Sequence, residues 1–217
     1  MSEDVCGRIR VVQIPVGALR ANCYLVYDDK SRQTVVIDPG DESETILSRI
    51  QELQIKPVLI LLTHGHGDHI GAVGDLKNAF QIPVAVHREE ANMLLDAQAN
   101  LSGLFGEPVL SPPADRLLKD GDEIEFGDHI ITVAHTPGHS PGGVCFGLNN
   151  HLFTGDALFK ETVGRTDLPG GSHVRLIRSI REKILSLSDD VILYPGHGPI
   201  TSVGEERRSN PYLREIV

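Results

Sequence analysis

The densest chemical signal in the chain is a group of four metal-binding side chains within six residues: His64, His66, Asp68 and His69. The group directly follows the apolar run Pro57–Leu62, which is typical of a strand buried on both faces. In an extended segment, residues two apart point the same way, so His64 and His66 can hold one ion together. Imidazoles and carboxylates are ligands that Zn, Mn and Fe accept, and four of them exceed the needs of one metal.

Three more candidate ligands, His139, Asp156 and His197, stand apart in the chain, each beside a glycine in a turn. A lone histidine in such a turn is usually just exposed to solvent. Each of these turns follows an apolar, strand-like segment, and loops that leave a sheet converge on a common edge. We therefore expect the three residues to join the first group. The alternative is a solvated polar loop in which Asp68 only caps the following helix. We do not favour it, because a cap needs one acid and no histidines.

The elements that must position these residues are short strands and a few helices. Strands are predicted at Arg8–Ile14 (ended by Pro15), Cys23–Tyr27, Thr34–Ile37, Pro57–Leu62, Val84–Val86, Glu123–Phe126, His129–Val133, Val144–Leu148, Leu152–Thr154 and Val191–Tyr194. Helices are predicted at Ser43–Gln54, from the histidine-rich loop to about Ala79, at 88–98 and at Ser172–Leu187, with Gly103–Ala114 irregular. This order of strands and helices, of the α/β (α+β) class, favours two β-sheets covered on the outside by helices.

Composition limits the classes of function. A chain of 217 residues with 40% hydrophobic and 23% charged residues is expected to form one globular domain, residues 1–217. A net charge of -10 without a basic run excludes nucleic acid as the expected partner. No apolar run is long enough to span a bilayer, and the N-terminus is acidic, so we expect no membrane partner. Only three cysteines are present, which favours a cytoplasmic location.

The order of the motifs resembles the metallo-β-lactamase superfamily. The matching positions are His-x-His-x-Asp-His at 64–69, Gly138-His139, Gly155-Asp156, Gly196-His197, Asn22–Val26 and Ile37–Gly40. The stretches Gly155–Phe159 and Gly164–Gly171 and the ending Glu206–Pro211 are more similar to the glyoxalase II-like thioester hydrolases, especially their short bacterial members. The resemblance implies a four-layer αβ/βα sandwich, with two mixed sheets and helices on the outer faces.

Carried over position by position, the resemblance implies two adjacent divalent metal ions, with Zn first and Fe or Mn as alternatives. One ion would be held by His64, His66 and His139, the other by Asp68, His69 and His197, and Asp156 would bridge the two. Two ions acidify a shared water, and the resulting hydroxide attacks a carbonyl. A thiolate leaves readily because the pKa of its thiol is only about 8.5, so no protein general acid is required. Asp68 and Asp156 are the predicted catalytic residues.

The implied substrate is a small-molecule thioester of the acyl-glutathione type, such as S-lactoylglutathione. Arg165, on the loop after Asp156, is the predicted substrate-binding residue, against the alternative of a solvated arginine. Full-length glyoxalase II enzymes carry a C-terminal helical domain that supplies much of the glutathione site. Only 20 residues follow His197, so we expect no such domain here. The chain is expected to be a monomer or a small homo-oligomer.

Other functions stay open at this point. Persulfide dioxygenases look similar and would use a single iron held by His64, His139 and Asp156, the facial-triad pattern. A metallohydrolase of another ester or a lactone, or of a β-lactam as a side activity, is also compatible with the motifs. A non-catalytic metal-binding module would predict missing ligands, and none is missing. Gly138–Gly142 matches the G-x-S-x-G nucleophile elbow but leads into a strand, so Ser140 is not expected to be a nucleophile.

Overall fold

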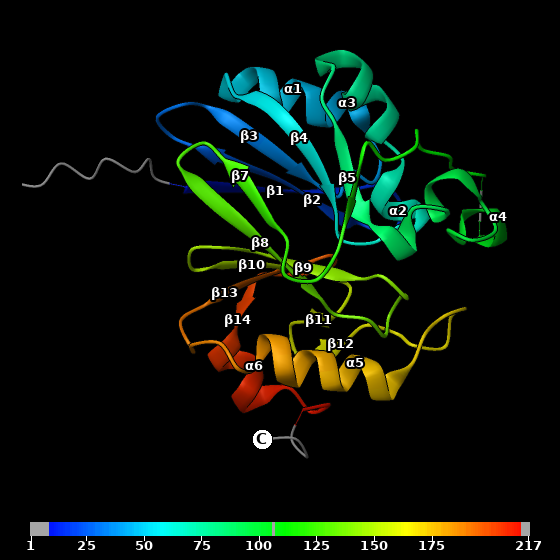
Figure 1. The fold of residues 1–217 in the computed structure, drawn as a ribbon, viewed down its shortest axis with the longest axis vertical. Coiled ribbons are helices and arrows are strands. Elements are labelled where there is room, and N and C mark those ends of the chain that lie inside the picture. Colours follow the sequence, from blue (N-terminus) through cyan, green and yellow to red (C-terminus); the bar gives the residue numbers. More distant parts are fainter. Residues whose placement is uncertain (1–8, 106, 214–217) are drawn as a thin grey trace, which may run out of the picture.

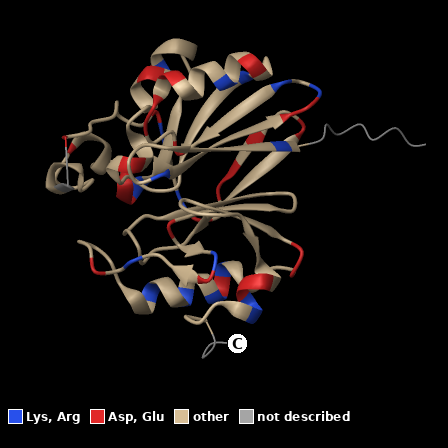
Figure 2. Ribbon diagram, turned by 180° about the vertical axis from the view of Figure 1, so that it is seen from behind, with Lys and Arg blue, Asp and Glu red and all other residues tan. Residues whose placement is uncertain are grey.

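The computed structural model describes residues 9–105 and 107–213. Cys6, Arg8 and the acidic N-terminus, which entered the sequence predictions, lie outside the described residues. Within these ranges no helix has the length and apolar character needed to cross a bilayer. Lys and Arg residues are dispersed among Asp and Glu residues on both helical faces of the molecule (Figure 2).

Two mixed six-stranded sheets form the centre of the molecule (Figure 1). The first contains, in spatial order, β1 (Ile9–Val16), β2 (Ala21–Asp28), β3 (Gln33–Ile37), β4 (Lys56–Leu62), β5 (Val84–His87) and β6 (Arg116–Leu118). The second contains β14 (Thr201–Ser202), β13 (Ile192–Pro195), β10 (His151–Gly155), β9 (Val144–Leu148), β8 (His129–His135) and β7 (Glu123–Phe126). A small hairpin of β11 (Leu158–Phe159) and β12 (Thr162–Val163) lies apart from both.

Helices cover the outer face of each sheet, which confirms the predicted four-layer sandwich (Figure 1). Helices α1 (Ser43–Leu53) and α3 (Val73–Phe80) cover the first sheet, and α5 (His173–Ser179) and α6 (Val203–Ser209) cover the second. Two short helices, α2 (Gly67–Ile70) and α4 (Ser102–Phe105), lie in the connections.

The central strands, such as β2, β4 and β9, are largely buried on both faces and are therefore mostly apolar, whereas β7 and β8 alternate between buried and exposed side chains. On β4, Leu59 and Leu61 pack in the core between the sheets, whereas Ile60 and Leu62 pack under α1 and α3. This alternation follows from the period of two along a strand. A third core lies between the second sheet and its helices and includes Cys145, Leu152, Leu176, Ile180, Leu193 and Val203. Burial of these apolar surfaces holds the four layers together.

Several predicted elements differ from the structure. The helix predicted at 88–98 is wrong, because the segment forms two 3₁₀ turns, Arg88–Glu90 and Met93–Leu95, with the side chain of Glu90 buried. Pro15 does not end β1, which continues to Val16, because an edge strand tolerates a residue without an N–H donor.

Other differences concern helix ends and very short elements. The helix predicted at Ser172–Leu187 is α5 followed by a π-helical turn, Ile180–Ile184. The segment predicted as irregular, Gly103–Ala114, overlaps α4. Sequence reasoning missed β6, β12, β14 and α6, which are three-residue or two-residue strands and one seven-residue helix.

The strands that lead to the predicted site end at one edge of the sandwich. Strands β3 and β4 are parallel, and β10 is parallel to β13. Strand β8 points the same way as β10, because both are antiparallel to β9. Asp38 follows β3, the histidine-rich loop follows β4, and the His139 loop follows β8. Asp156 follows β10, and His197 follows β13. The topology therefore gathers side chains that are up to 159 residues apart.

The histidine-rich segment lies against the loop that follows β3. The backbone N–H of Gly71 donates to the carbonyl of Gly40 at 2.9 Å, and the N–H of Ala72 donates to the carbonyl of Pro39 at 2.9 Å. A Cβ atom on Gly40 would lie only 1.8 Å from the carbonyl oxygen of Asp68. Only glycine at position 40 permits this approach of two backbones.

We expect Gly40→Ala to lower the free energy of unfolding by about 1–3 kcal/mol, because the added methyl group must push α2 away. The matched control is Gly74→Ala in α3, where the nearest atom to a new Cβ would be Pro112 Cδ at an ordinary 3.6 Å. That change should raise stability by about 0.5–1 kcal/mol through helix propensity. Urea unfolding followed by circular dichroism measures both. Equal effects of the two substitutions would contradict the close approach at Gly40.

Candidate metal centre

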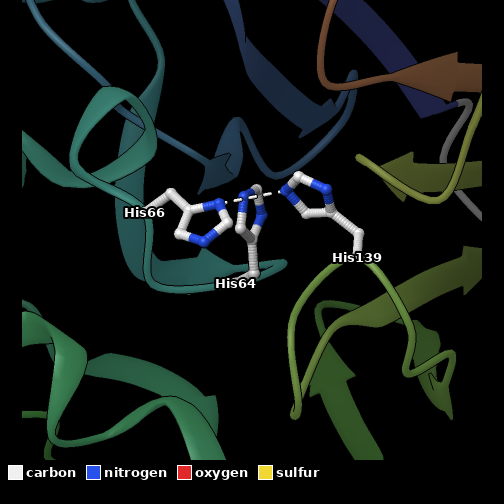
Figure 3. Close-up of side chains that lie close together, drawn as sticks. All are labelled: His64, His66 and His139. Atoms are coloured by element: carbon white, nitrogen blue, oxygen red, sulfur yellow. Dashed lines mark hydrogen bonds between the residues drawn. The ribbon is translucent and has the colours of Figure 1, made fainter. Parts of the chain in front are cut away.

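Three histidines from the two halves of the chain face one another (Figure 3). His64 and His66 come from the loop after β4, and His139 comes from the loop after β8. His139 Nε2 lies 3.0 Å from His66 Nδ1, and the ring centroids of His64 and His139 are 5.0 Å apart. One nitrogen of each ring lies within 4.8 Å of the other two. We call His64, His66 and His139 the first triad.

The second triad consists of Asp68, His69 and His197, whose candidate ligand atoms also lie within 4.8 Å of one another. Asp68 and His69 lie on α2, and His197 follows β13. His197 Nε2 is 3.2 Å from Asp68 Oδ2, and His69 Nε2 is 3.6 Å from the same oxygen. The side chains of Asp68 and His197 are 24% and 27% exposed, whereas His69 is fully buried. The second triad is therefore the more accessible one.

Asp156 lies between the two triads. Its Oδ2 is 3.5 Å from His139 Nε2 of the first triad and 3.5 Å from His197 Nε2 of the second. Its Oδ1 is 3.5 Å from His69 Nε2. The structure thus brings all seven sequence-predicted ligand residues together, with the carboxylate of Asp156 next to members of both groups.

Backbone carbonyls orient two of the histidines. His139 Nδ1 donates to the carbonyl of Arg165 at 2.9 Å, and His197 Nδ1 donates to the carbonyl of Leu19 at 3.2 Å. Because a carbonyl only accepts, Nδ1 of each ring carries a proton, so Nε2 is the nitrogen whose lone pair can bind a cation. In both rings Nε2 is the atom that faces Asp156. A tautomer held in this way is typical of a metal ligand.

Asp38 orients the other pair, and sequence reasoning assigned it no site role. Its Oδ2 accepts from His69 Nδ1 at 3.1 Å and from the Thr63 hydroxyl at 2.6 Å, and its Oδ1 accepts from the Thr63 N–H at 2.7 Å. The Thr63 hydroxyl is in turn 3.1 Å from His64 Nδ1, and its remaining lone pair can accept that N–H. The one signal for this network was Asp38 in the family-like stretch Ile37–Gly40.

The two triads differ electrostatically. Burial lowers the pKa of His66 to about 3, with a further contribution from His139, and burial together with His69 holds the pKa of His64 well below its usual value. Burial also acts to lower the pKa of His69 and His197, but neighbouring carboxylates outweigh it and raise these pKa values to about 9 and about 10. His64 and His66 of the first triad are thus neutral imidazoles, whereas His69 and His197 of the second favour the protonated form beside carboxylates.

The donor set fits divalent metal ions. His64 Nε2, His69 Nε2 and Asp156 Oδ1 are buried and find no hydrogen-bond partner among the described residues. A buried polar atom without a partner costs about 1–3 kcal/mol, so three such atoms in one place are unusual in a stable protein. Bound cations would satisfy all three. Nitrogen and carboxylate donors of this kind suit Zn, Fe and Mn alike.

A pocket of about 580 Å³ opens above the second triad. Its apolar lining comes from Leu19, Leu101, Phe159, Val163 and Leu168, and its polar lining includes Asn100, Ser102, Thr162 and Arg165. His66, Asp68, His139, Asp156 and His197 reach the same pocket. The arrangement provides a chamber in which a small molecule can lie directly against the two triads.

Arg165 reaches the pocket, but its guanidinium already has a partner. Its Nε and Nη2 donate to the two carboxylate oxygens of Asp167, each at 2.8 Å. The Arg165 side chain is 58% exposed, so this pair is solvated. A substrate carboxylate would have to displace Asp167 to use the planar fork of the guanidinium.

One wall of the pocket is held from behind by helix α6. Glu206 is buried, and its Oε2 accepts from the N–H of Glu161 at 2.8 Å. Asn210 Nδ2 donates to the carbonyl of Thr162 at 3.2 Å. Both contacts end on the β11–β12 hairpin, whose Phe159 and Val163 line the pocket. These hydrogen bonds give the family-like ending Glu206–Pro211 a structural role.

Comparisons with known proteins agree with this geometry. The model of the metallo-beta-lactamase superfamily matches residues 16–197. The probable metallo-hydrolase YqgX of Bacillus subtilis is 41% identical over 204 residues, covering 93% of this chain and 96% of the relative. The hydroxyacylglutathione hydrolase GloC of Haemophilus influenzae is 39% identical over 204 residues, covering 92% of this chain and 96% of the relative.

Solved structures agree as well. The crystal structure of the B3 metallo-beta-lactamase BLEG-1 superposes with a TM-score of 0.92 at 42% identity, covering 94% of this chain and 100% of that one. The crystal structure of TTHA1623 in a di-iron-bound form superposes with a TM-score of 0.84 at 40% identity, again covering 94% and 100%. With its sandwich fold, its histidine–aspartate cluster and these relatives, the chain belongs to the metallo-β-lactamase superfamily.

Proposed function

We propose that this chain is a binuclear metallohydrolase that cleaves a thioester of the acyl-glutathione type. The observation that carries the proposal is the pair of triads on either side of Asp156, with buried ligand atoms that have no hydrogen-bond partner in the part of the chain that the structure describes. Similarity over nearly the whole chain to a protein named hydroxyacylglutathione hydrolase supports the substrate class. The pocket above the second triad supports a small-molecule substrate.

Two divalent ions held by these residues would lower the pKa of a water molecule and polarise the scissile carbonyl. The remaining roles belong to the chain's own side chains. Asp156, between the triads, would be the carboxylate shared by both ions, and Asp68, which is 24% exposed and borders the pocket, would accept the proton that the water loses. The apolar pocket wall limits the access of other water. The departing thiolate requires no acid, since the pKa of a thiol is about 8.5.

Zinc is our first assignment for the ions. The donors accept iron equally well, and a similar protein has been crystallised in a di-iron-bound form. A single-iron dioxygenase that uses His64, His139 and Asp156 would leave the second triad without a purpose, although the protein orients His69 and His197 with dedicated partners. We therefore favour two ions over one.

A second candidate activity is hydrolysis of a β-lactam at the same site. The observation in its favour is the structural similarity to a B3 metallo-beta-lactamase at 42% identity. Both activities require water attack on an acyl carbonyl, so they place the same demands on the two triads. Parallel assays with S-lactoylglutathione and a chromogenic cephalosporin distinguish them, and hydrolysis of the cephalosporin alone would overturn the thioester assignment.

Metal content tests the two-ion assignment directly. Elemental analysis at saturating Zn should give two ions per chain for the parent protein and about one for His69→Ala, which removes a ligand of the second triad only. Asp156→Ala removes the shared carboxylate and should weaken the binding of both ions. A saturated parent with a single ion would contradict the assignment and favour the dioxygenase alternative.

Hydrolysis should proceed without a protein nucleophile. We expect Ser140→Ala to keep most of the activity on S-lactoylglutathione, because Ser140 precedes a strand and has the wrong context for an elbow. His66→Ala should abolish turnover by breaking the first triad. Initial rates measure both variants. Detection of an acylated Ser140 by mass spectrometry would disprove the water-attack route.

Replacing Arg165 and replacing Asp167 should change the KM for an anionic substrate in opposite directions. Arg165→Ala should raise the KM for S-lactoylglutathione a few-fold with kcat and metal content unchanged, the pattern of lost uniform binding. Asp167→Ala frees the guanidinium and should lower the same KM. Arg181→Ala, an exposed arginine on the π-helical turn, is the matched control. If KM is the same in all four proteins, Arg165 is a solvated surface residue.

A further inference from the structure

Glu90 is a fully buried carboxylate outside the ligand set. It ends the 3₁₀ turn Arg88–Glu90, which follows β5, and its side chain points inward between two loops. Its Oε2 accepts the backbone N–H of Gly65 at 2.8 Å, and its Oε1 accepts the backbone N–H of Gly142 at 2.5 Å. A buried carboxylate that bridges two backbone N–H groups is a strong and directional tie.

The two N–H groups belong to the two loops that carry the first triad. Gly65 lies between His64 and His66, on the loop after β4 of the first sheet. Gly142 lies three residues after His139, on the loop between β8 and β9 of the second sheet. The carboxylate of Glu90 therefore spans the junction between the sheets at the point where the first triad is assembled from both.

We infer that Glu90 is a positioning residue that sets the distance between His139 and the His64–His66 pair, and thereby the affinity of the first triad for its ion. The inference rests on the ligand assignment of the proposed function. A backbone contact, from the Val144 N–H to the Thr63 carbonyl at 2.9 Å, joins the same two loops near their strands. Glu90 supplies the link beside the histidines themselves.

The residues around Glu90 match this role. A Cβ atom on Gly142 would lie 2.9 Å from Glu90 Cγ, so the glycine permits the short hydrogen bond. Burial raises the pKa of Glu90, while the N–H groups of Gly65 and Gly142 act to lower it. A carboxylate is the side chain that fits, since both of its oxygens accept. Glutamine in its place can accept from one N–H only and turns its own amide donor toward the other.

The second triad is positioned by different groups. Asp38 holds His69, and the carbonyl of Leu19 holds His197. The backbone hydrogen bonds of Glu90 end on Gly65 and Gly142, and its side-chain neighbour Ser140 adjoins His139, so all of these contacts lie beside the first triad. Disturbing Glu90 should therefore act on one ion rather than on both, which separates a positioning role from a general loss of stability.

The test uses Co(II), whose visible absorption reports the geometry of each bound ion. Glu90→Gln is made in the parent protein, in His69→Ala, which retains the first triad, and in His139→Ala, which retains the second. Glu89→Gln, an exposed neighbour, is the matched control. Co(II) affinity comes from chelator competition, and spectra, unfolding midpoints, kcat and KM are recorded in parallel.

We expect Glu90→Gln to weaken Co(II) binding in the His69→Ala background by about tenfold to a hundredfold, the usual effect of removing a group that orients ligands, and to shift the visible bands. Co(II) affinity in the His139→Ala background and in all Glu89→Gln proteins should stay the same. Glu90→Asp keeps both oxygens on a shorter arm and should recover part of the lost affinity.

Unchanged Co(II) affinity and spectra in Glu90→Gln/His69→Ala would overturn the inference, even if the unfolding midpoint falls. Equal weakening in both backgrounds would overturn it as well. Failure of the proposed function has a different signature, because it shows in the parent protein as fewer than two Co(II) ions or as no thioester turnover. In that case the role of Glu90 is still tested by comparing the Co(II) affinity of Glu90→Gln/His69→Ala with that of His69→Ala alone.

Discussion

The structure depends on one constraint: the lone pairs of five imidazoles and two carboxylates must converge on a small volume. Side chains of this kind repel one another or compete for protons when they are brought together, as the depressed pKa of His66 and the raised pKa of His197 show. Such a cluster persists only if the surrounding protein fixes each member. Neighbouring groups do so for four of the histidines, namely Asp38 for His69, Thr63 for His64, and the carbonyls of Arg165 and Leu19 for His139 and His197.

The sandwich supplies the rigidity that this convergence requires. The central strands of each sheet are buried on both faces, so they cannot slide without moving apolar side chains into the wrong layer. The ligands lie just beyond the ends of those strands, where little chain remains to bend. Helix α2 adds Asp68 and His69 and is fixed in turn by its close backbone contact with Gly40. The packing of the cores thus determines how precisely the ligand side chains are positioned.

The sequence predicted most of this architecture because its main signals are local. Continuous apolar runs and the alternation of apolar and polar residues predicted the long strands. Four ligand-type side chains within six residues predicted the histidine-rich loop. The helix expected at 88–98 failed because a pattern of apolar residues does not show that Glu90 turns inward to bind two backbone N–H groups. Asp38 was assigned no site role because sequence spacing does not show that its carboxylate meets Thr63 and His69 across neighbouring strands. The partner of Arg165 was equally hidden, since its pairing with Asp167 depends on the path of a loop.

The apolar side chains of the pocket wall lie outside the two triads, whereas the backbone carbonyls of Leu19 and Arg165 also orient His197 and His139. The wall comes from the β11–β12 hairpin tethered by α6, from the Leu19 turn and from the Leu168 loop, and those apolar side chains belong to neither triad. Substitutions can therefore accumulate in the wall over evolutionary time without disturbing the reaction centre. Proteins about 40% identical to this chain bear names as different as hydroxyacylglutathione hydrolase and B3 metallo-beta-lactamase. Because the side chains of the wall can change while the two triads stay in place, one fold can provide pockets of different shape and polarity beside the same ligand set.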